Sequence, residues 1–117
     1  MSHKSVPESS YLGEFEMVVL LAILRLGDEA YGIAIRNELE RETSREITMG
    51  AIYKTLGRME EKGYVSARIG PPTPQRGGRR KKIYRLEPIG SRAVKQSYAD
   101  LRRLTRGLGR ALGAETL

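Results

Sequence analysis

The chain has 117 residues, the length of one domain, and its 21 basic and 14 acidic side chains give a formal charge of +7 and an isoelectric point near 10.0. This surplus favours an acidic polymer as partner, although a basic surface with no partner stays open as the plainer alternative. The absence of cysteine excludes disulfides, thiolate zinc ligands and cysteine nucleophiles.

The start of the chain predicts no membrane segment. Residues 1–11 are mostly polar and include Pro7, so we expect a flexible N-terminal arm. The longest uncharged apolar run, Met17 to Leu24, is only about a third of the length that a bilayer span needs. No basic segment followed by an apolar run opens the chain, as it would in a signal peptide. A cytoplasmic protein without a membrane partner is therefore expected.

Two helices are predicted next. Leu12 to Leu26 is dominated by apolar residues and is too long for a typical strand, so it indicates a helix buried on more than one face. Tyr31 to Glu42 follows after a turn, with Ile35 and Leu39 four residues apart and facing inward. The residues predicted to face outward on this second helix are Arg36, Glu40 and Arg41.

A third helix is predicted from Thr48 to Lys62. Thr48 is suited to be its N-cap, and Ile52, Leu56 and Met59 are spaced four and three apart on the side that packs. The other side is left largely free, and its residues are Thr48, Met49, Gly50, Tyr53, Lys54 and Arg58. A helix of this kind packs with one face and can contact a nucleic-acid groove with the other.

Two strands, Tyr64 to Ile69 and Lys82 to Leu86, are predicted to form a hairpin. In the first, Val65, Ala67 and Ile69 alternate with polar residues, so one face can lie on the helices. The loop Gly70 to Gly78 contains three prolines and is not expected to continue a strand. The hairpin end is strongly basic, and its charged residues are Arg76, Arg79, Arg80 and Lys81. Such a hairpin is suited to phosphate contact.

A last helix is predicted from Ile89 to about Ala111, with Pro88 in its first turn. Its apolar residues follow a near-heptad pattern that is typical of helix pairing, although folding back onto the chain's own core stays open. The stripe consists of Val94, Leu101 and Leu108, a second row of Ser97, Leu104 and Ala111, and the flanking Tyr98 and Leu112. Three glycines near the end are expected to fray it.

The order of these elements predicts the fold. Three helices followed by a strand, a basic loop and a second strand are the signature of a winged helix-turn-helix. We therefore expect a mainly α (α+β) chain with a winged helix domain over residues 12–87, a C-terminal dimerisation helix over 88–113 and a tail over 114–117. The compact unit has about 80 residues, and a core that small often needs a partner.

Five segments carry a resemblance to a known family. They are the apolar helix Leu12 to Leu26, the Ala30 to Ile33 start of the second helix, Met49 to Glu60, Gly63 to Val65 and Arg79 to Leu86. Together they resemble the PadR family of bacterial transcriptional regulators, in the type with a short C-terminal helix. The third helix of that family typically contains the sequence Gly, then Ser, Ala or Thr, then Leu or Ile, then Tyr. A Leu follows, and after it the sequence Arg, then Leu or Met, then Glu.

The resemblance, which covers about residues 12 to 95, implies a dimer that binds DNA. The third helix would enter the major groove, with Tyr53 on phosphate and Met49, Gly50 and Lys54 closest to base edges. The wing would lie along the backbone or minor groove, its phosphate contacts being Arg76, Arg79, Arg80 and Lys81. The first and last helices would pair the two copies, through Leu12, Phe15, Val94, Tyr98, Leu101, Leu104 and Leu108. Glu87 replaces the usual Thr or Ser, so the last helix lacks its common cap.

The functional expectation is a sequence-specific DNA-binding regulator, a repressor, that binds a palindromic operator as a homodimer. No carboxylate pair or phosphate-binding loop supports an enzyme, and no cofactor or metal site is expected. Two alternatives stay open: a nucleic-acid binder without sequence preference, and a protein interaction module that uses the same basic surface. A small-molecule effector also stays open, because some relatives bind one between their first and last helices.

Overall fold

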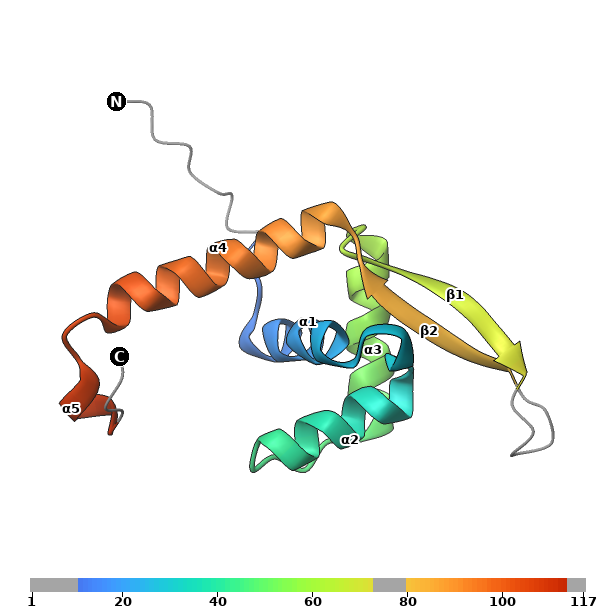
Figure 1. Cartoon of the computed structure of the whole chain (residues 1–117), viewed down its shortest axis with the longest axis horizontal. Helices are drawn as coiled ribbons and strands as arrows, with labels where there is room; N and C mark the ends of the chain where they lie inside the picture. The colour runs from blue at the N-terminus through green and yellow to red at the C-terminus, as the bar shows by residue number, and fades with distance from the viewer. Residues whose placement is uncertain (1–10, 73–79, 114–117) are drawn as a thin grey trace.

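The computed structural model describes residues 11–72 and 80–113, which form three helices, a hairpin and a long C-terminal helix (Figure 1). The wing and the last helix extend in opposite directions from the helical core. In chain order the elements are α1 (Glu14–Leu26), the 3-10 turn η2 (Gly27–Glu29), α2 (Gly32–Glu42), α3 (Met49–Glu61), β1 (Val65–Pro72), β2 (Arg80–Leu86), α4 (Pro88–Thr105) and α5 (Gly109–Leu112). This order confirms the winged helix-turn-helix. The predicted N-terminal arm, apart from Tyr11, and the predicted tail lie outside the described residues.

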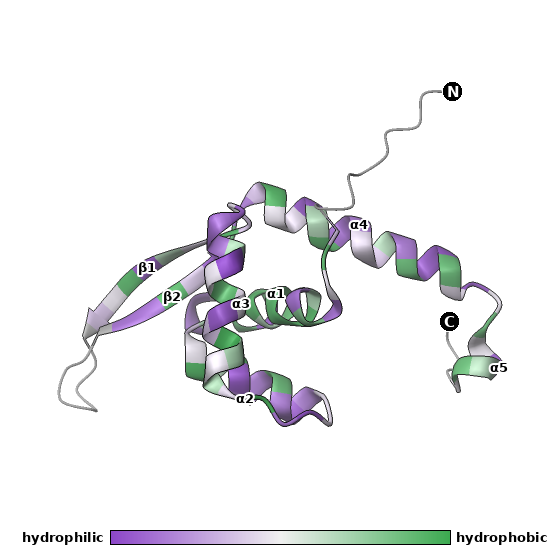
Figure 2. Ribbon diagram, turned by 180° about the vertical axis from the view of Figure 1, so that it is seen from behind, coloured by the Kyte–Doolittle hydropathy of each residue, from purple (hydrophilic) through white to green (hydrophobic). Residues whose placement is uncertain are grey.

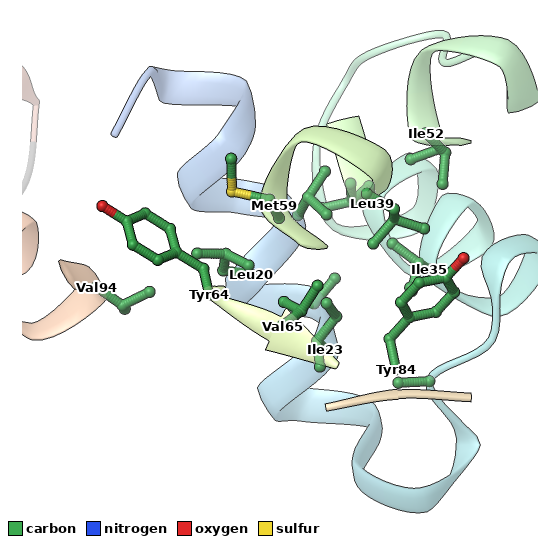
Figure 3. Packing of buried hydrophobic residues seen from close by; sticks show 14 of the residues in the cluster. Leu20, Ile23, Ile35, Leu39, Ile52, Met59, Tyr64, Val65, Tyr84 and Val94 are labelled. Carbon is green, nitrogen blue, oxygen red and sulfur yellow. The ribbon is translucent and has the colours of Figure 1, made fainter. Parts of the chain in front are cut away.

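The core lies where α1, α2 and α3 meet β1, β2 and the start of α4 (Figure 3). Val19 and Leu20 of α1 are fully buried, as are Ile35 of α2 and Ile52 and Leu56 of α3. Each such side chain contributes about 1.5–3 kcal/mol by leaving water. The prediction that α1 is buried on more than one face is wrong, since its buried residues, Glu16, Val19, Leu20, Ala22 and Ile23, share one broad face, and Leu21 and Leu24 on the other side are exposed.

Helix α3 begins and ends as its sequence predicts. The Oγ1 atom of Thr48 accepts a hydrogen bond from the backbone N–H of Ala51 at 3.1 Å, which confirms the N-cap. The packing residues Ile52, Leu56 and Met59 are all buried. At the other end Gly63 adopts a φ of 76°, a left-handed conformation that turns the chain directly into β1.

The two strands pair antiparallel, with Ala67 opposite Tyr84 and Ile69 opposite Lys82. The prediction that the strand ends at Ile69 is wrong, because β1 continues to Pro72 across a register irregularity. We attribute this to the edge position of β1, where a missing proline N–H costs no ladder bond. The predicted alternation also fails at this end, since Ile69 is 60% exposed.

The other side of β2 is joined to the start of α2. The backbone N–H of Tyr84 donates to the carbonyl of Ala30 at 2.8 Å, and Tyr31 forms a bridge with Ile83. Tyr84 itself is buried, and burial raises the pKa of its phenol. The wing is therefore fixed at its base to the same segment that begins α2.

Helix α4 starts at Pro88 after an extended Glu87, which gives no side-chain cap. It ends at Thr105, so the prediction of one helix to about Ala111 is wrong. Gly107 breaks it with a φ of 80°, and the short α5 follows. Val94 is buried in the core, whereas the second half of α4 extends beyond it, with apolar and polar positions alternating along its length (Figure 2).

Candidate nucleic-acid interface

Helix α3 presents one smooth exposed face beside the wing. Its middle is formed by Gly50, Tyr53, Lys54 and Gly57, which the 3.6-residue period places together. A Cβ at Gly57 would have no neighbour within 4 Å, and one at Gly50 would meet only the Thr48 hydroxyl at 3.9 Å. The helix backbone is thus open to close approach by a large molecule along two turns.

The structure brings most of the predicted α3 residues together on this face. Thr48, Gly50, Tyr53 and Lys54 are exposed, and Met49 is half-buried at the first turn. The ring of Tyr53 also packs, because it lies against Gly32 of α2 with 54% of the residue still exposed. Tyr53 therefore serves the α2–α3 contact and the open face at once.

Arg58 lies at the margin of this face. Its Nε atom is 3.5 Å from Oε2 of Glu16, and the Nζ atom of Lys62 is 3.8 Å from the same oxygen. The other Glu16 oxygen accepts the backbone N–H of Gly13 at 2.8 Å, which caps α1. Glu16 therefore ties the start of α1 to the C-terminal half of α3, and Arg58 belongs to that junction.

Three side-chain contacts hold the wing to the helices: one cation–π contact and two ion pairs. The Nζ atom of Lys81 lies 3.9 Å from the centre of the Tyr31 ring, a cation–π contact. The Nζ atom of Lys82 lies 3.3 Å from Oε1 of Glu60, and this hydrogen bond is the main cause of the raised pKa of Lys82. Arg68 of β1 lies 3.6 Å from Asp28.

The remaining predicted wing residues are placed only in part. Arg80 begins β2, and the positions of Arg76 and Arg79 lie outside the described residues. Lys81 is therefore the one predicted wing cation whose side chain the structure describes, and it points to Tyr31 of α2's N-cap. The wing and the first turn of α2 consequently share one surface.

The turn between α2 and α3 is fixed by Glu40. Its Oε2 atom accepts the backbone N–H of Ile47 at 2.9 Å, while Oε1 lies 3.9 Å from Nε of Arg36. The sequence placed Arg36 among solvated residues, whereas the structure leaves only 32% of its side chain exposed. A signal was present in the sequence: Arg36 follows Gly32 by four residues and so shares its face of α2.

A comparison with protein families identifies the family to which this winged helix chain belongs. The Transcriptional regulator PadR-like family matches residues 20–96, about two thirds of the chain. The chain belongs to this family of transcriptional regulators. A comparison with curated proteins gave no match.

Solved PadR structures share the fold. A PadR family regulator from Clostridium difficile R20291 has 26% identity and a TM-score of 0.64, over 84% of this chain and 98% of that one. One from Eggerthella lenta has 26% identity and a TM-score of 0.61, over 89% and 88%. Bacillus subtilis PadR in complex with operator DNA has 22% identity and a TM-score of 0.58, over 73% of this chain and 48% of that one.

This PadR-like chain also exposes several large apolar side chains on α4 and α1. The second half of α4 exposes Tyr98 (56%), Leu101 (50%) and Leu104 (72%), and Leu108 follows at 45%. On α1 the sequence prediction missed two exposed leucines, Leu21 and Leu24. Of the predicted pairing residues, Leu12 and Phe15 are half-buried and Val94 is buried within its own core. The spacing of apolar residues did not show which of these positions are exposed and which are buried, because all of them belong to apolar stripes.

A cavity of about 710 Å³ lies between the start of α1 and α4 of this PadR-like chain. Leu12, Met17, Ile89 and Leu101 give it apolar walls. Three charged residues also line it: Glu14, Arg92 and Asp100. Among the helices that the structure describes, none is long and apolar enough to cross a bilayer.

Proposed function

We propose that this PadR-like protein is a sequence-specific DNA-binding transcriptional regulator, and that it acts as a repressor. The observation that carries the proposal is the open face of α3, where Gly50, Tyr53, Lys54 and Gly57 lie together beside the wing. A helix of about 10–12 Å diameter fits the major groove, and two glycines let its backbone come closer than side chains would allow.

Each residue then has a role set by its place. Met49, Gly50 and Lys54 lie nearest the base edges, and Thr48 and Tyr53 donate to phosphate oxygens. The basic wing, with Arg76, Arg79, Arg80 and Lys81, contacts phosphates and so fixes orientation without selecting sequence. Arg58, held by Glu16, lies at the margin and contributes mainly through its charge.

The protein acts as a homodimer. The leucines that α4 and α1 expose are large apolar side chains in water, and a second copy of the chain would cover them. A two-fold dimer places two α3 helices about one helical turn of DNA apart and therefore requires a palindromic operator. Bacillus subtilis PadR, which shares the fold, has been solved in complex with operator DNA, and this supports DNA binding.

Repression would follow from occupation of the promoter, which blocks RNA polymerase. The site of action is then the cytoplasm, on the nucleoid. The cavity between α1 and α4 has the volume of a small-molecule site, and a ligand there would touch both helices of the proposed dimer contact. An effector would thus act on the distance between the two α3 helices.

Fluorescence anisotropy tests the function. The purified protein is titrated against a duplex of about 30 base pairs, long enough for two half-sites, that the protein itself enriched from a random pool, and against a scrambled duplex of equal length. Affinities that differ by about a thousandfold or more at physiological salt support an operator-specific regulator. Equal affinities with equal salt slopes would leave a nucleic-acid binder without sequence preference. No binding to either duplex would favour the protein interaction module.

A further inference from the structure

We propose that Arg36 of α2 is a further DNA contact, which binds a backbone phosphate next to the one that Tyr53 binds. The inference rests on the proposed function and adds a residue that the α3 and wing pattern does not include. In a helix-turn-helix, the helix that precedes the groove-binding one crosses the DNA backbone. Arg36 is the basic side chain of α2 on the side where that crossing would occur.

The place of Arg36 follows from the helix period. Gly32 and Arg36 are four residues apart and therefore lie on one face of α2. Gly32 is covered by the Tyr53 ring, and the helix period places Arg36 one turn further along this same face of α2. At its other side Glu40 holds the backbone of Ile47, just before α3 starts.

The bonding of Arg36 leaves capacity for an anion. Its Nε atom is buried and has no hydrogen-bond partner, the one such atom among the side chains that the structure describes, and burial puts it out of reach of an outside molecule. The nearest carboxylate oxygen, Oε1 of Glu40, is 3.9 Å away, too far for a hydrogen bond. One terminal nitrogen, Nη2, donates to Asn37 Oδ1 at 3.1 Å. The guanidinium is therefore oriented from its buried side, and with 32% of the side chain exposed a phosphate would bind at the terminal nitrogens.

Other arginines near α2 are committed to carboxylates at shorter range. Arg25 and Arg41 both bond to Glu38, the first at 2.5 Å, and Arg45 lies 2.6 Å from Glu14. The one carboxylate near Arg36 is Glu40, at the long distance of 3.9 Å, and the other oxygen of Glu40 is occupied by the N–H of Ile47. Because guanidinium presents several donors in a plane, it suits a phosphate that approaches the open side.

A competing role is that Arg36 only offsets the negative charge of Glu40, which would otherwise repel DNA. The variant Glu40→Gln separates the two roles, since its amide oxygen still accepts the Ile47 N–H. If Arg36 contacts phosphate, the loss caused by Arg36→Gln is the same in the wild-type and in the E40Q background. If Arg36 only offsets Glu40, that loss disappears in the E40Q background.

The experiment measures Kd of wild type, R36Q, E40Q and R36Q/E40Q on the duplex enriched by the wild-type protein, over a salt series. We expect R36Q to weaken binding about tenfold or more in both backgrounds. The salt slope of the dimer should fall by about 2, one contact per protomer. R41Q carries the same charge change on α2 away from the interface, and its affinity should stay within about twofold of wild type.

Unchanged binding by R36Q, or a loss that vanishes beside E40Q, would overturn the assignment of Arg36. Thermal unfolding of each variant shows whether a change in binding reflects a change in folding. If instead the wild-type protein does not distinguish its enriched duplex from the scrambled one, the proposed function fails, whatever Arg36 does. The two failures are therefore told apart by the wild-type titration alone.

Discussion

The ring of Tyr53 lies directly against Gly32: a Cβ on Gly32 would be 2.6 Å from the Tyr53 hydroxyl oxygen and 2.8 Å from two ring carbons. Because Gly32 has no side chain, the single aromatic residue of α3 can lie against the start of α2. One contact thus joins the packing of the two helices to the face proposed to meet DNA.

Gly32→Ala should affect DNA binding more than folding. The added methyl group must displace the Tyr53 ring, which is the end of a movable side chain, while alanine favours the helix by about 1 kcal/mol. We expect a thermal midpoint near that of wild type and a DNA affinity lowered about tenfold or more, the cost of a lost hydrogen bond to a charged group. Anisotropy on the enriched duplex and thermal unfolding measure the two effects.

The control for this prediction is the same change in a Tyr53→Ala background. Without the ring, the methyl group at position 32 has nothing to displace, so Gly32→Ala should then leave affinity unchanged. A further loss in that background would show that Gly32 acts by another route than Tyr53.

Gly57→Ala should separate folding from binding in another way. A Cβ at this position has open space within 4 Å, so the variant gains helix propensity of about 1 kcal/mol without a clash. If α3 lies deep in the major groove, the same methyl group should reduce affinity for the enriched duplex. A raised unfolding midpoint with unchanged affinity would place Gly57 outside the interface.

Gly90→Ala should destabilise the protein, because the contact it meets cannot move easily. A Cβ there would lie 2.1 Å from the backbone carbonyl oxygen of Tyr64, which itself accepts the N–H of Glu87. We expect a loss of about 1–3 kcal/mol as α4 shifts away from the end of α3. Chemical denaturation measures it, with Gly57→Ala as the matched change in open space; equal stabilities of the two variants would contradict the prediction.

The sequence predicted those elements whose cause is local. The Thr48 cap and the Ile52, Leu56 and Met59 spacing needed only a few neighbouring residues, and both are confirmed. The end of α4 at Gly107 could not be predicted in the same way. A glycine lowers the helix propensity of its segment, but the sequence does not show whether it adopts the positive φ that ends the helix. Nor did a proline-containing strand follow from composition, since it depends on the edge position of β1.

The sequence predicted which residues form the candidate site better than it predicted the contacts between them. Tyr53, Lys54 and Gly50 share a face because the helix period places them there. Contacts between elements distant in sequence were missed: Glu16 with Arg58 and Lys62, and Lys81 with the Tyr31 ring. These depend on how helices and strands cross, which no local pattern contains.

Leu104→Glu should abolish the proposed dimer without unfolding the protomer. Leu104 is 72% exposed in a single chain, so a carboxylate there is solvated in the monomer but buried without a partner in the dimer. Sedimentation velocity should show the wild type as a dimer and the variant as a monomer with far-UV circular dichroism unchanged. Arg102→Gln, an equal change in net charge at an exposed position of α4, is the control and should remain dimeric.

Acid should weaken the fold partly through Glu38. This buried carboxylate bonds to Arg25 at 2.5 Å and to Arg41, and the hydrogen bond from Arg25 is the main reason that its pKa is lowered. Because the folded pKa lies below the unfolded value of about 4.3, the stabilisation is fully present above that pH and is lost as pH falls through the folded pKa.

Glu38→Gln removes this titration, so the variant should be less stable than wild type at pH 7, and the difference should shrink as the pH falls below about 4. Thermal unfolding from pH 7 to pH 3 measures it. Glu87, whose pKa is lowered mainly by a hydrogen bond from Ser66, remains in both proteins and contributes the same acid dependence to each. Curves that stay parallel over the whole range would show that the Arg25–Glu38 contact does not set the acid limb.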